Sequence, residues 1–153
     1  MKFIVVAGGQ GTKLWPVSRE SKPKQFQPIV DGKSTFQINI EVLLRQYNPE
    51  DICISTKRKF IKYVSEQTPQ IPLKNYIIEP DIKLDRGPGE GLAFLMMSVK
   101  HPDEPFLVVQ SDLVRPPEEA YLQMLKDVEA FVRKTRMFVT GGLKAMKADM
   151  GAD

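Results

Sequence analysis

The sequence predicts an α/β protein with three layers, in which a mostly parallel sheet is covered by helices on both faces. Short β-branched and apolar runs alternate along the chain with stretches whose apolar residues recur at helical spacing. The apolar runs end at glycine or polar residues, as buried strands of such sheets do. Strands that are joined through helices run parallel, so this alternation predicts the architecture.

Five short apolar runs are predicted to be the strands. The first covers residues 2–7 and is closed by Gly8 and Gly9. The other four runs cover residues 52–55, 76–78, 106–109 and 137–140. Ligands of open α/β sheets bind outside the carboxyl ends of the strands, so the residues that follow these runs are the expected site. At the amino ends, residues 50–51 and 103–104 are predicted to be ordinary solvated turns.

Four amphipathic segments are predicted to be the connecting helices. The first begins at Ser34, a good N-cap, and ends before Pro49. The second is short and includes residues 60–64, the third covers residues 91–100, and the fourth follows residues 116–117. On the third helix Leu92, Leu95, Met96 and Val99 lie on one face, and the pair Met96-Met97 is expected in the core. On the fourth helix the stripe from Tyr121 to Phe131 is expected to be a core face.

The composition is that of an ordinary globular domain. The chain has 153 residues, of which 42% are hydrophobic and 27% are charged, and a chain of this length has room for one sizeable core. Its net charge of +3 favours small anionic ligands and is too low to indicate nucleic acid, so no nucleic-acid partner is expected. The single cysteine, Cys53, excludes an internal disulfide and fits a reducing compartment.

The apolar runs predict neither a secretory signal nor a membrane partner. Residues 3–7 form a run shorter than the roughly 7–15 apolar residues of a signal peptide. The next run, residues 92–97, is far below the roughly 18 residues that would indicate a membrane helix. We therefore expect a cytoplasmic protein.

A glycine-rich and basic segment follows the first predicted strand. Gly8, Gly9 and Gly11 come directly after a buried run, where their backbone N–H groups can approach phosphate oxygens. Four cations then follow, namely Lys13, Arg19, Lys22 and Lys24. Close backbone with nearby cations predicts a phosphate site, and a solvated basic loop is the alternative. The segment matches neither a Walker A loop nor the dinucleotide fingerprint.

Carboxylates follow the third and fourth predicted strands. Glu79 stands at a strand end, where its carboxylate can accept hydrogen bonds from a ligand, and an ordinary turn is the alternative interpretation. Asp112 is predicted to bind Mg²⁺, which prefers one or two carboxylates together with phosphate oxygens and waters. A capping or turn role is the alternative for Asp112.

Together these segments resemble the sugar-phosphate nucleotidyltransferases. The resemblance lies in residues 7–16, in Ser18-Arg19 and in the Pro-Lys-Gln-Phe sequence of residues 23–26. Within that group, the Leu-Trp-Pro-x-Ser-Arg sequence of residues 14–19 and the Pro-Lys-Gln-Phe sequence most resemble mannose-1-phosphate guanylyltransferases. The resemblance implies a Rossmann-like fold of the nucleotide-diphospho-sugar transferase type. It also implies that GTP and the hexose 1-phosphate mannose 1-phosphate give GDP-mannose and pyrophosphate, with Mg²⁺ as cofactor.

The resemblance also implies a role for each matching residue. The phosphates would be held by Gly8, Gly9, Gly11 and Thr12, and charge at the α-phosphorus would be neutralised by Lys13 and Lys24, with Arg19 as a further contact. The base and ribose pocket would be lined by Glu79, Pro80, Gly87 and Pro88, and the metal would be held by Asp112. The family usually has arginine in place of Lys13 and histidine in place of Leu113.

The resemblance covers residues 1–144, which match the nucleotide-binding half of the family's domain, whereas residues 145–153 form an atypical tail. We therefore expect a truncated sheet with an uncovered edge, which would favour a homodimer or a complementing chain. Two alternatives stay open, a non-catalytic nucleotide-binding or regulatory remnant and a relative of the uridylyl- or thymidylyltransferases.

Overall fold

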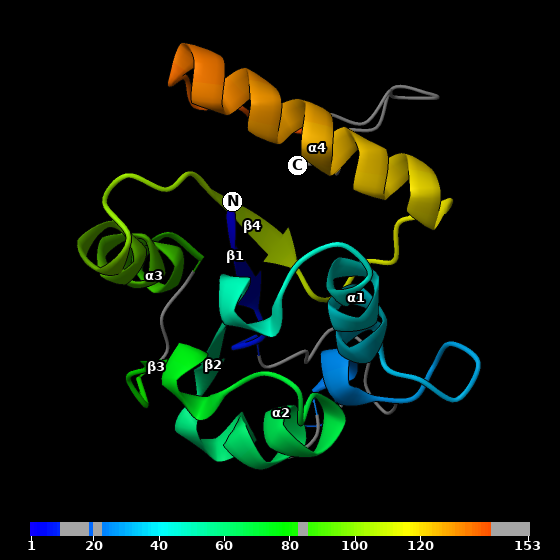
Figure 1. Ribbon diagram of the computed structural model, residues 1–153. Helices are drawn as coiled ribbons and strands as arrows, with labels where there is room; N and C mark the ends of the chain where they lie inside the picture. The colour runs from blue at the N-terminus through cyan, green and yellow to red at the C-terminus, as the bar shows by residue number, and fades with distance from the viewer. Residues whose placement is uncertain (10–18, 20–22, 83–85, 142–153) are drawn as a thin grey trace, which may run out of the picture.

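A parallel four-stranded sheet organises the chain (Figure 1). The computed structural model describes residues 1–9, 19, 23–82 and 86–141. The strands are β1 (Lys2–Val6), β2 (Ile52–Lys57), β3 (Tyr76–Glu79) and β4 (Phe106–Gln110). They lie in the order β3-β2-β1-β4, and every neighbouring pair is parallel. All four carboxyl ends therefore meet at one edge.

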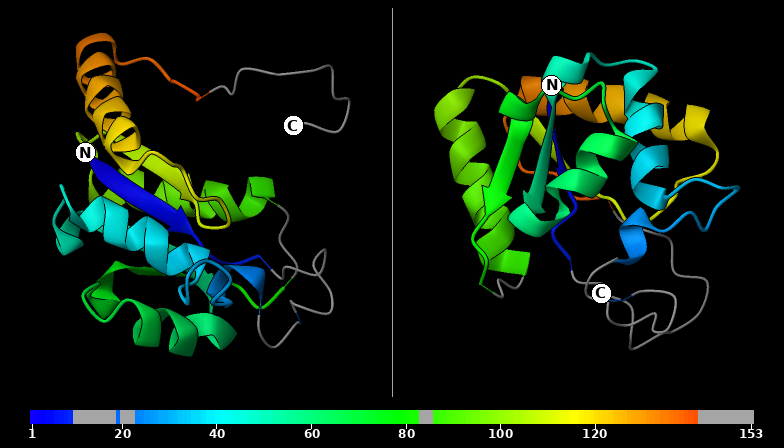
Figure 2. Two further views of the ribbon diagram at one scale, coloured as in Figure 1. Left: turned by 90° about the vertical axis from the view of Figure 1, so that its right-hand side faces the viewer. Right: turned by 90° about the horizontal axis from the view of Figure 1, so that it is seen from below.

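Helices cover both faces of the sheet, as the sequence predicts. The helices are α1 (Thr35–Leu44), α2 (Ile61–Gln67), α3 (Arg86–Lys100) and α4 (Glu118–Thr135). Figure 2 shows α3 on one face, whereas α1 and α2 lie on the other. Short 3-10 turns complete the described elements, namely η2 (Lys24–Phe26), η3 (Pro49–Asp51), η4 (Arg58–Phe60) and η5 (Leu73–Asn75). The three-layer α/β fold is confirmed.

Two apolar clusters lie on opposite sides of the sheet because strand side chains alternate between its faces. The larger cluster includes Phe3 and Val5 of β1 and also takes in Leu122 and Leu125 of α4. The smaller cluster lies under α3 and comprises Ile4, Cys53, Ile77, Ala93 and Met97. Cys53 is a buried free thiol, as expected. No helix within the described ranges is both long and apolar enough to cross a bilayer.

Local sequence signals set the ends of the helices. Ser34 caps α1, since its Oγ accepts from the backbone N–H of Gln37 while the Gln37 side chain accepts from the Ser34 N–H. Helix α4 has Glu118 and Glu119 in its first turn and Arg133 in its last turn, an arrangement that complements the helix dipole.

The predicted fifth strand is wrong. Residues 137–140 form no strand, and the side chains of Met137 and Phe138 are 60% and 90% exposed. Helix α4 ends at Thr135, and Arg136 adopts a left-handed conformation with φ 55°. An apolar run becomes a strand only where a neighbour pairs with its backbone, and within the described residues the sheet ends at β4.

The predicted apolar faces of α3 and α4 are also wrong in part. Helix α3 begins at Arg86 and rests on the sheet through Ala93 and Met97, and the burial of Met97 is as predicted. The side chains of Leu95, Met96 and Val99 are 63%, 45% and 75% exposed. The exposed face of α3 borders an apolar groove of about 450 Å³ beside β3. On α4 the buried residues are Leu122 and Leu125, whereas Phe131 is 49% exposed. Helical spacing thus identified apolar faces without showing which of them the chain covers.

Candidate functional site

The predicted site residues that the structure describes lie at the carboxyl ends of the parallel strands. Gly8 and Gly9 follow β1, Glu79 ends β3, and Asp112 comes two residues after β4. Gly11, Thr12 and Lys13 lie outside the described residues. Their predicted phosphate contacts remain predictions.

Glu79 and Gly8 make the closest approach in this site. The Glu79 side chain is 7% exposed, and its Oε1 accepts a hydrogen bond of 3.1 Å from Ser55 Oγ on β2. A Cβ on Gly8 would overlap Glu79 Oε1 and lie 2.6 Å from Oε2. A Cβ on Gly89, near the start of α3, would lie 3.9 Å from Oε2. The Glu79 carboxylate therefore sits between the end of β1 and the first turns of α3, where only a residue without a side chain fits at Gly8.

A second cluster joins the two charged residues that were expected to handle phosphate and metal. Lys24 in η2 places its Nζ 2.6 Å from Asp112 Oδ2, and about a third of each side chain is exposed (30% and 36%). Elsewhere in the described ranges, no three histidine, cysteine or acidic side chains gather in a group that could hold a metal. A half-exposed single carboxylate beside a cation fits Mg²⁺ only if phosphate oxygens and waters supply the other ligands, which is the arrangement that Mg²⁺ commonly adopts with nucleotides.

The loop that carries Asp112 is held by Asn39 of α1 and by Arg115 of the loop itself. Asn39 is 4% exposed and donates from Nδ2 to the carbonyl of Leu113 over 2.8 Å. The Asn39 Oδ1 accepts from Arg115 over 2.7 Å, and Arg115 also donates to the carbonyl of Gln110 over 3.3 Å. These contacts fix the backbone on both sides of Asp112.

Buried polar side chains also hold the backbone that leads out of β1. Gln25 donates to the carbonyls of Ala7 and Gly9, Thr56 donates to the carbonyl of Ala7, and Ser111 donates to the carbonyl of Val6. No role was predicted from the sequence for Gln25, Ser55 or Thr56. The available signal was the position of Gln25 inside the Pro-Lys-Gln-Phe segment, next to the predicted Lys24.

A buried lysine adds positive charge near Glu79. Lys57 is the register partner of Glu79 on the neighbouring strand and is 5% exposed. Its Nζ donates to the carbonyl of Ile82 over 3.2 Å. This side of the sheet thus holds both a carboxylate and an ammonium at its carboxyl edge.

The remaining predicted residues lie around these clusters. Arg19 and Pro80 are exposed, as are Gly87 and Pro88. The last two belong to the first turn of α3, where proline is well tolerated, instead of to a turn before the helix. The structure thus brings together Gly8 with Glu79 and Lys24 with Asp112, while phosphate contact by Arg19 and pocket-lining by the other three residues stay predictions.

Fold and site together define an α/β protein whose polar residues gather at the carboxyl edge of a parallel sheet. The Nucleotidyl transferase family profile matches residues 2–148. Mannose-1-phosphate guanylyltransferase of Escherichia coli is 32% identical over 154 residues, which cover 97% of this chain and 32% of that protein. RfbM of Salmonella typhimurium, also named a mannose-1-phosphate guanylyltransferase, is 30% identical over 152 residues, which cover 97% of this chain and 31% of that protein. The chain belongs to the nucleotidyltransferase family.

A solved structure supports the same fold. The protein described as mannose-1-phosphate geranyltransferase from Thermus thermophilus superposes with a TM-score of 0.71 and is 28% identical. The match covers 82% of this chain and 36% of that protein. The chain therefore spans about a third of the length of the relatives that it matches.

Proposed function

We propose that this chain provides the nucleotide-binding part of a guanylyltransferase that forms GDP-mannose and pyrophosphate from GTP and mannose 1-phosphate. The observation that carries the proposal is the contact between Lys24 and Asp112 at the carboxyl edge of the sheet. A cation and a metal-binding carboxylate at one place suit a triphosphate that is bound with Mg²⁺. The names of the relatives support mannose 1-phosphate as the second substrate.

In the proposed reaction, an oxygen of the sugar phosphate attacks the α-phosphorus of GTP, and pyrophosphate leaves from the opposite side. Such a transfer asks the protein for positioning and for neutralisation of charge, and it needs no covalent intermediate. Asp112 would hold Mg²⁺, which neutralises charge on the phosphate oxygens when it is bound. Lys24, within contact of Asp112, would place its ammonium on the same phosphate chain.

Glu79 would select the base. Its carboxylate is buried at the end of β3, and Ser55 fixes one of its oxygens. A carboxylate can accept the ring N–H and the exocyclic amine of guanine, whereas uracil and thymine lack that pair of donors. Replacing Glu79 with glutamine should therefore weaken GTP binding more than UTP binding.

Binding and turnover test the proposal separately. Calorimetry should show that the chain binds GTP in the presence of Mg²⁺, and that Asp112→Asn and Lys24→Met each weaken this binding about tenfold or more, because each removes a charge from the phosphate chain. Asp103→Asn, an exposed change at the opposite end of the sheet, is the matched control and should leave the affinity unchanged.

Release of pyrophosphate from GTP, mannose 1-phosphate and Mg²⁺ tests catalysis. Turnover that Asp112→Asn abolishes would support an enzyme. GTP binding without pyrophosphate release would instead support the non-catalytic alternative for this chain. Tighter binding of UTP or dTTP than of GTP would contradict the choice of guanine.

A further inference from the structure

The carbonyl groups at the end of β1 are held by three buried side chains, which we call the carbonyl clamp: Gln25, Thr56 and Ser111. Their exposed fractions are 3%, 0% and 3%. Thr56 Oγ1 lies 3.3 Å from the carbonyl oxygen of Ala7, and Ser111 Oγ lies 2.6 Å from that of Val6. The sheet's own bonding ends here with the N–H of Ala7, which donates to the carbonyl of Ser55 over 2.8 Å.

Gln25 makes two of the four hydrogen bonds of the clamp. Its Nε2 lies 3.1 Å from the carbonyl oxygen of Ala7 and 2.8 Å from that of Gly9. A carboxamide nitrogen has two N–H donors, so Gln25 donates both of them to this backbone. The two contacts lie on either side of Gly8, and the contact with Gly9 lies beyond the bond from the Ala7 N–H to Ser55.

The geometry of the peptide unit gives these contacts a consequence for the loop. In a trans peptide the C=O and the following N–H point in opposite directions. Because Gln25 draws the carbonyl of Ala7 toward the α1 side of the site, the N–H of Gly8 is directed away from Gln25. An anion is bound by backbone N–H groups, and a carbonyl oxygen turned toward the same anion would repel it.

Gln25 also couples this backbone to the charged residues of the site. Lys24, immediately before Gln25, contacts Asp112, and Phe26, immediately after it, is fully buried among Phe36, Phe60 and Tyr63. One 3-10 turn thus presents the ammonium, holds the backbone after β1 and anchors both in the core. The distance between the backbone N–H of Gly8 and the Lys24 ammonium therefore depends on this turn.

We propose that Gln25 is a positioning residue that keeps the carbonyls of Ala7 and Gly9 turned toward its own side chain, so that the backbone N–H of Gly8 stays available to the phosphates of the nucleotide. This inference rests on the proposed function for its ligand. It assigns to Gln25 a role in phosphate affinity and none in base selection, which belongs to Glu79 on the other face of the sheet.

Gln25→Met tests the role, because methionine fills a similar volume and donates no hydrogen bond. Calorimetry with GTP and with inorganic pyrophosphate should show about tenfold weaker binding of both ligands, because the Gly9 carbonyl loses its bond from Gln25 and the Ala7 carbonyl keeps only the bond from Thr56. The ratio of the GTP and UTP affinities should stay the same. A loss of folding alone would lower both binding capacity and thermal stability without changing the affinity of the folded fraction.

Thr56→Val gives a graded second variant that removes one bond to the Ala7 carbonyl and leaves both bonds from Gln25. It should weaken pyrophosphate binding about twofold and keep the same GTP to UTP ratio. Gln70→Met makes the same substitution at an exposed glutamine, and as the control it should change the affinity for neither GTP nor pyrophosphate. Amide hydrogen exchange should accelerate in Gln25→Met at Ala7, whose N–H donates to the carbonyl of Ser55, while β2 keeps its protection.

The outcomes separate the two proposals. If the unaltered chain binds GTP, and Gln25→Met binds GTP and pyrophosphate as tightly as the unaltered chain does, the positioning role is wrong and the proposed function stands. A changed GTP to UTP ratio in Gln25→Met would also overturn the role, since it would place Gln25 in base selection. A chain that binds neither ligand would overturn both proposals.

Discussion

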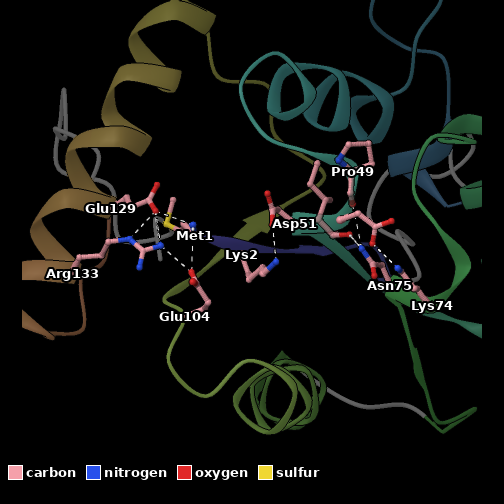
Figure 3. Close-up of polar contacts among 11 residues, drawn as sticks. Met1, Lys2, Pro49, Asp51, Lys74, Asn75, Glu104, Glu129 and Arg133 are labelled. Carbon is pink, nitrogen blue, oxygen red and sulfur yellow. Dashed lines mark hydrogen bonds and ion pairs between the residues drawn. The ribbon is translucent and has the colours of Figure 1, made fainter.

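The two ends of the parallel sheet use polar residues in opposite ways. At the amino ends, charged groups pair with one another: Lys2 lies 2.6 Å from Asp51, and Arg133 lies 2.9 Å from both Glu104 and Glu129 (Figure 3). At the carboxyl ends, polar side chains such as Gln25 and Ser111 hold backbone carbonyls. The charged groups of the amino end are paired with one another, whereas the carboxyl end combines the pair of Lys24 and Asp112 with uncharged side chains that hold the backbone.

This difference indicates where a ligand can gain binding energy. At the amino end, the ammonium of Met1 lies 2.8 Å from Glu129 and 3.7 Å from Glu104, so an incoming anion would have to displace carboxylates that are already in place. At the carboxyl end, carbonyls that are already paired leave the opposite side of the backbone to a ligand.

The largest expected effect comes from removing the aromatic support of the carboxyl end. Phe26 is fully buried, with ring centroids 5.2 Å from Phe36, 5.5 Å from Tyr63 and 5.8 Å from Phe60. Phe26→Ala should lower the free energy of unfolding by about 3–5 kcal/mol, as measured by urea denaturation, because a buried ring is replaced by a cavity.

Phe138→Ala is the matched control for that change. Its ring is 90% exposed, so the substitution should alter the unfolding free energy by less than about 0.5 kcal/mol. Equal losses in the two variants would mean that residues 137–140 are covered in solution. That result would restore the strand-like role that the sequence pattern predicted for this run.

The sequence pattern was enough to predict the three layers of the fold and the placement of the site at the carboxyl ends of the strands. Buried strands and polar residues at their ends are local signals, so β1 to β4 and the positions of Glu79 and Asp112 could be predicted. The capping box of Ser34 is equally local. The roles of the site residues were predicted by resemblance to family motifs, and their gathering at the carboxyl ends of the strands followed from strands that run parallel.

The errors arise where the answer depends on a distant partner. Residues 137–140 have the composition of a strand, but strand formation is decided by a neighbour that can pair with them. Leu95 and Val99 have the spacing of a buried face, but α3 meets the sheet through Ala93 and Met97. The contacts of Gln25 with Ala7 and Gly9 join segments that only the folded chain brings together.

A smaller effect is expected from filling the space at the end of β1. Gly8→Ala places a methyl group against the buried Glu79 carboxylate, so either Glu79 leaves Ser55 or the backbone shifts. We expect a loss of about 1–3 kcal/mol in unfolding free energy and weaker GTP binding. Thermal denaturation and calorimetry measure the two effects.

Gly9→Ala is the matched control, because a Cβ at Gly9 would meet nothing within 4 Å. It should leave stability almost unchanged. In a Glu79→Ala background, Gly8→Ala should become nearly neutral, since the carboxylate that it meets has been removed. A persistent loss in that background would show that the backbone of Gly8, and not the contact with Glu79, requires glycine.

The smallest expected effect is at the amino end and depends on pH. Burial would raise the pKa of Glu129, but hydrogen bonds from the Met1 ammonium and from Arg133 outweigh it and leave the pKa below its usual range. A carboxylate with a lowered pKa in the folded state stabilises the fold above its unfolded pKa of about 4.3, and this contribution is lost as the pH falls through the folded value. Glu129→Gln should therefore be less stable than the unaltered chain at pH 7 by up to about 1 kcal/mol.

The difference between the two proteins should shrink as the pH is lowered below about 4, and it should also shrink in high salt. Glu66→Gln, which removes an exposed carboxylate 3.8 Å from Lys62, is the control and should leave the free energy of unfolding at pH 7 almost unchanged. Because the amino end pairs its own charges, Glu129→Gln should also leave the GTP affinity unchanged. If Glu129→Gln weakened GTP binding, the charges at the two ends of the sheet would be coupled. The amino end could then no longer be described as separate from the end that binds the ligand.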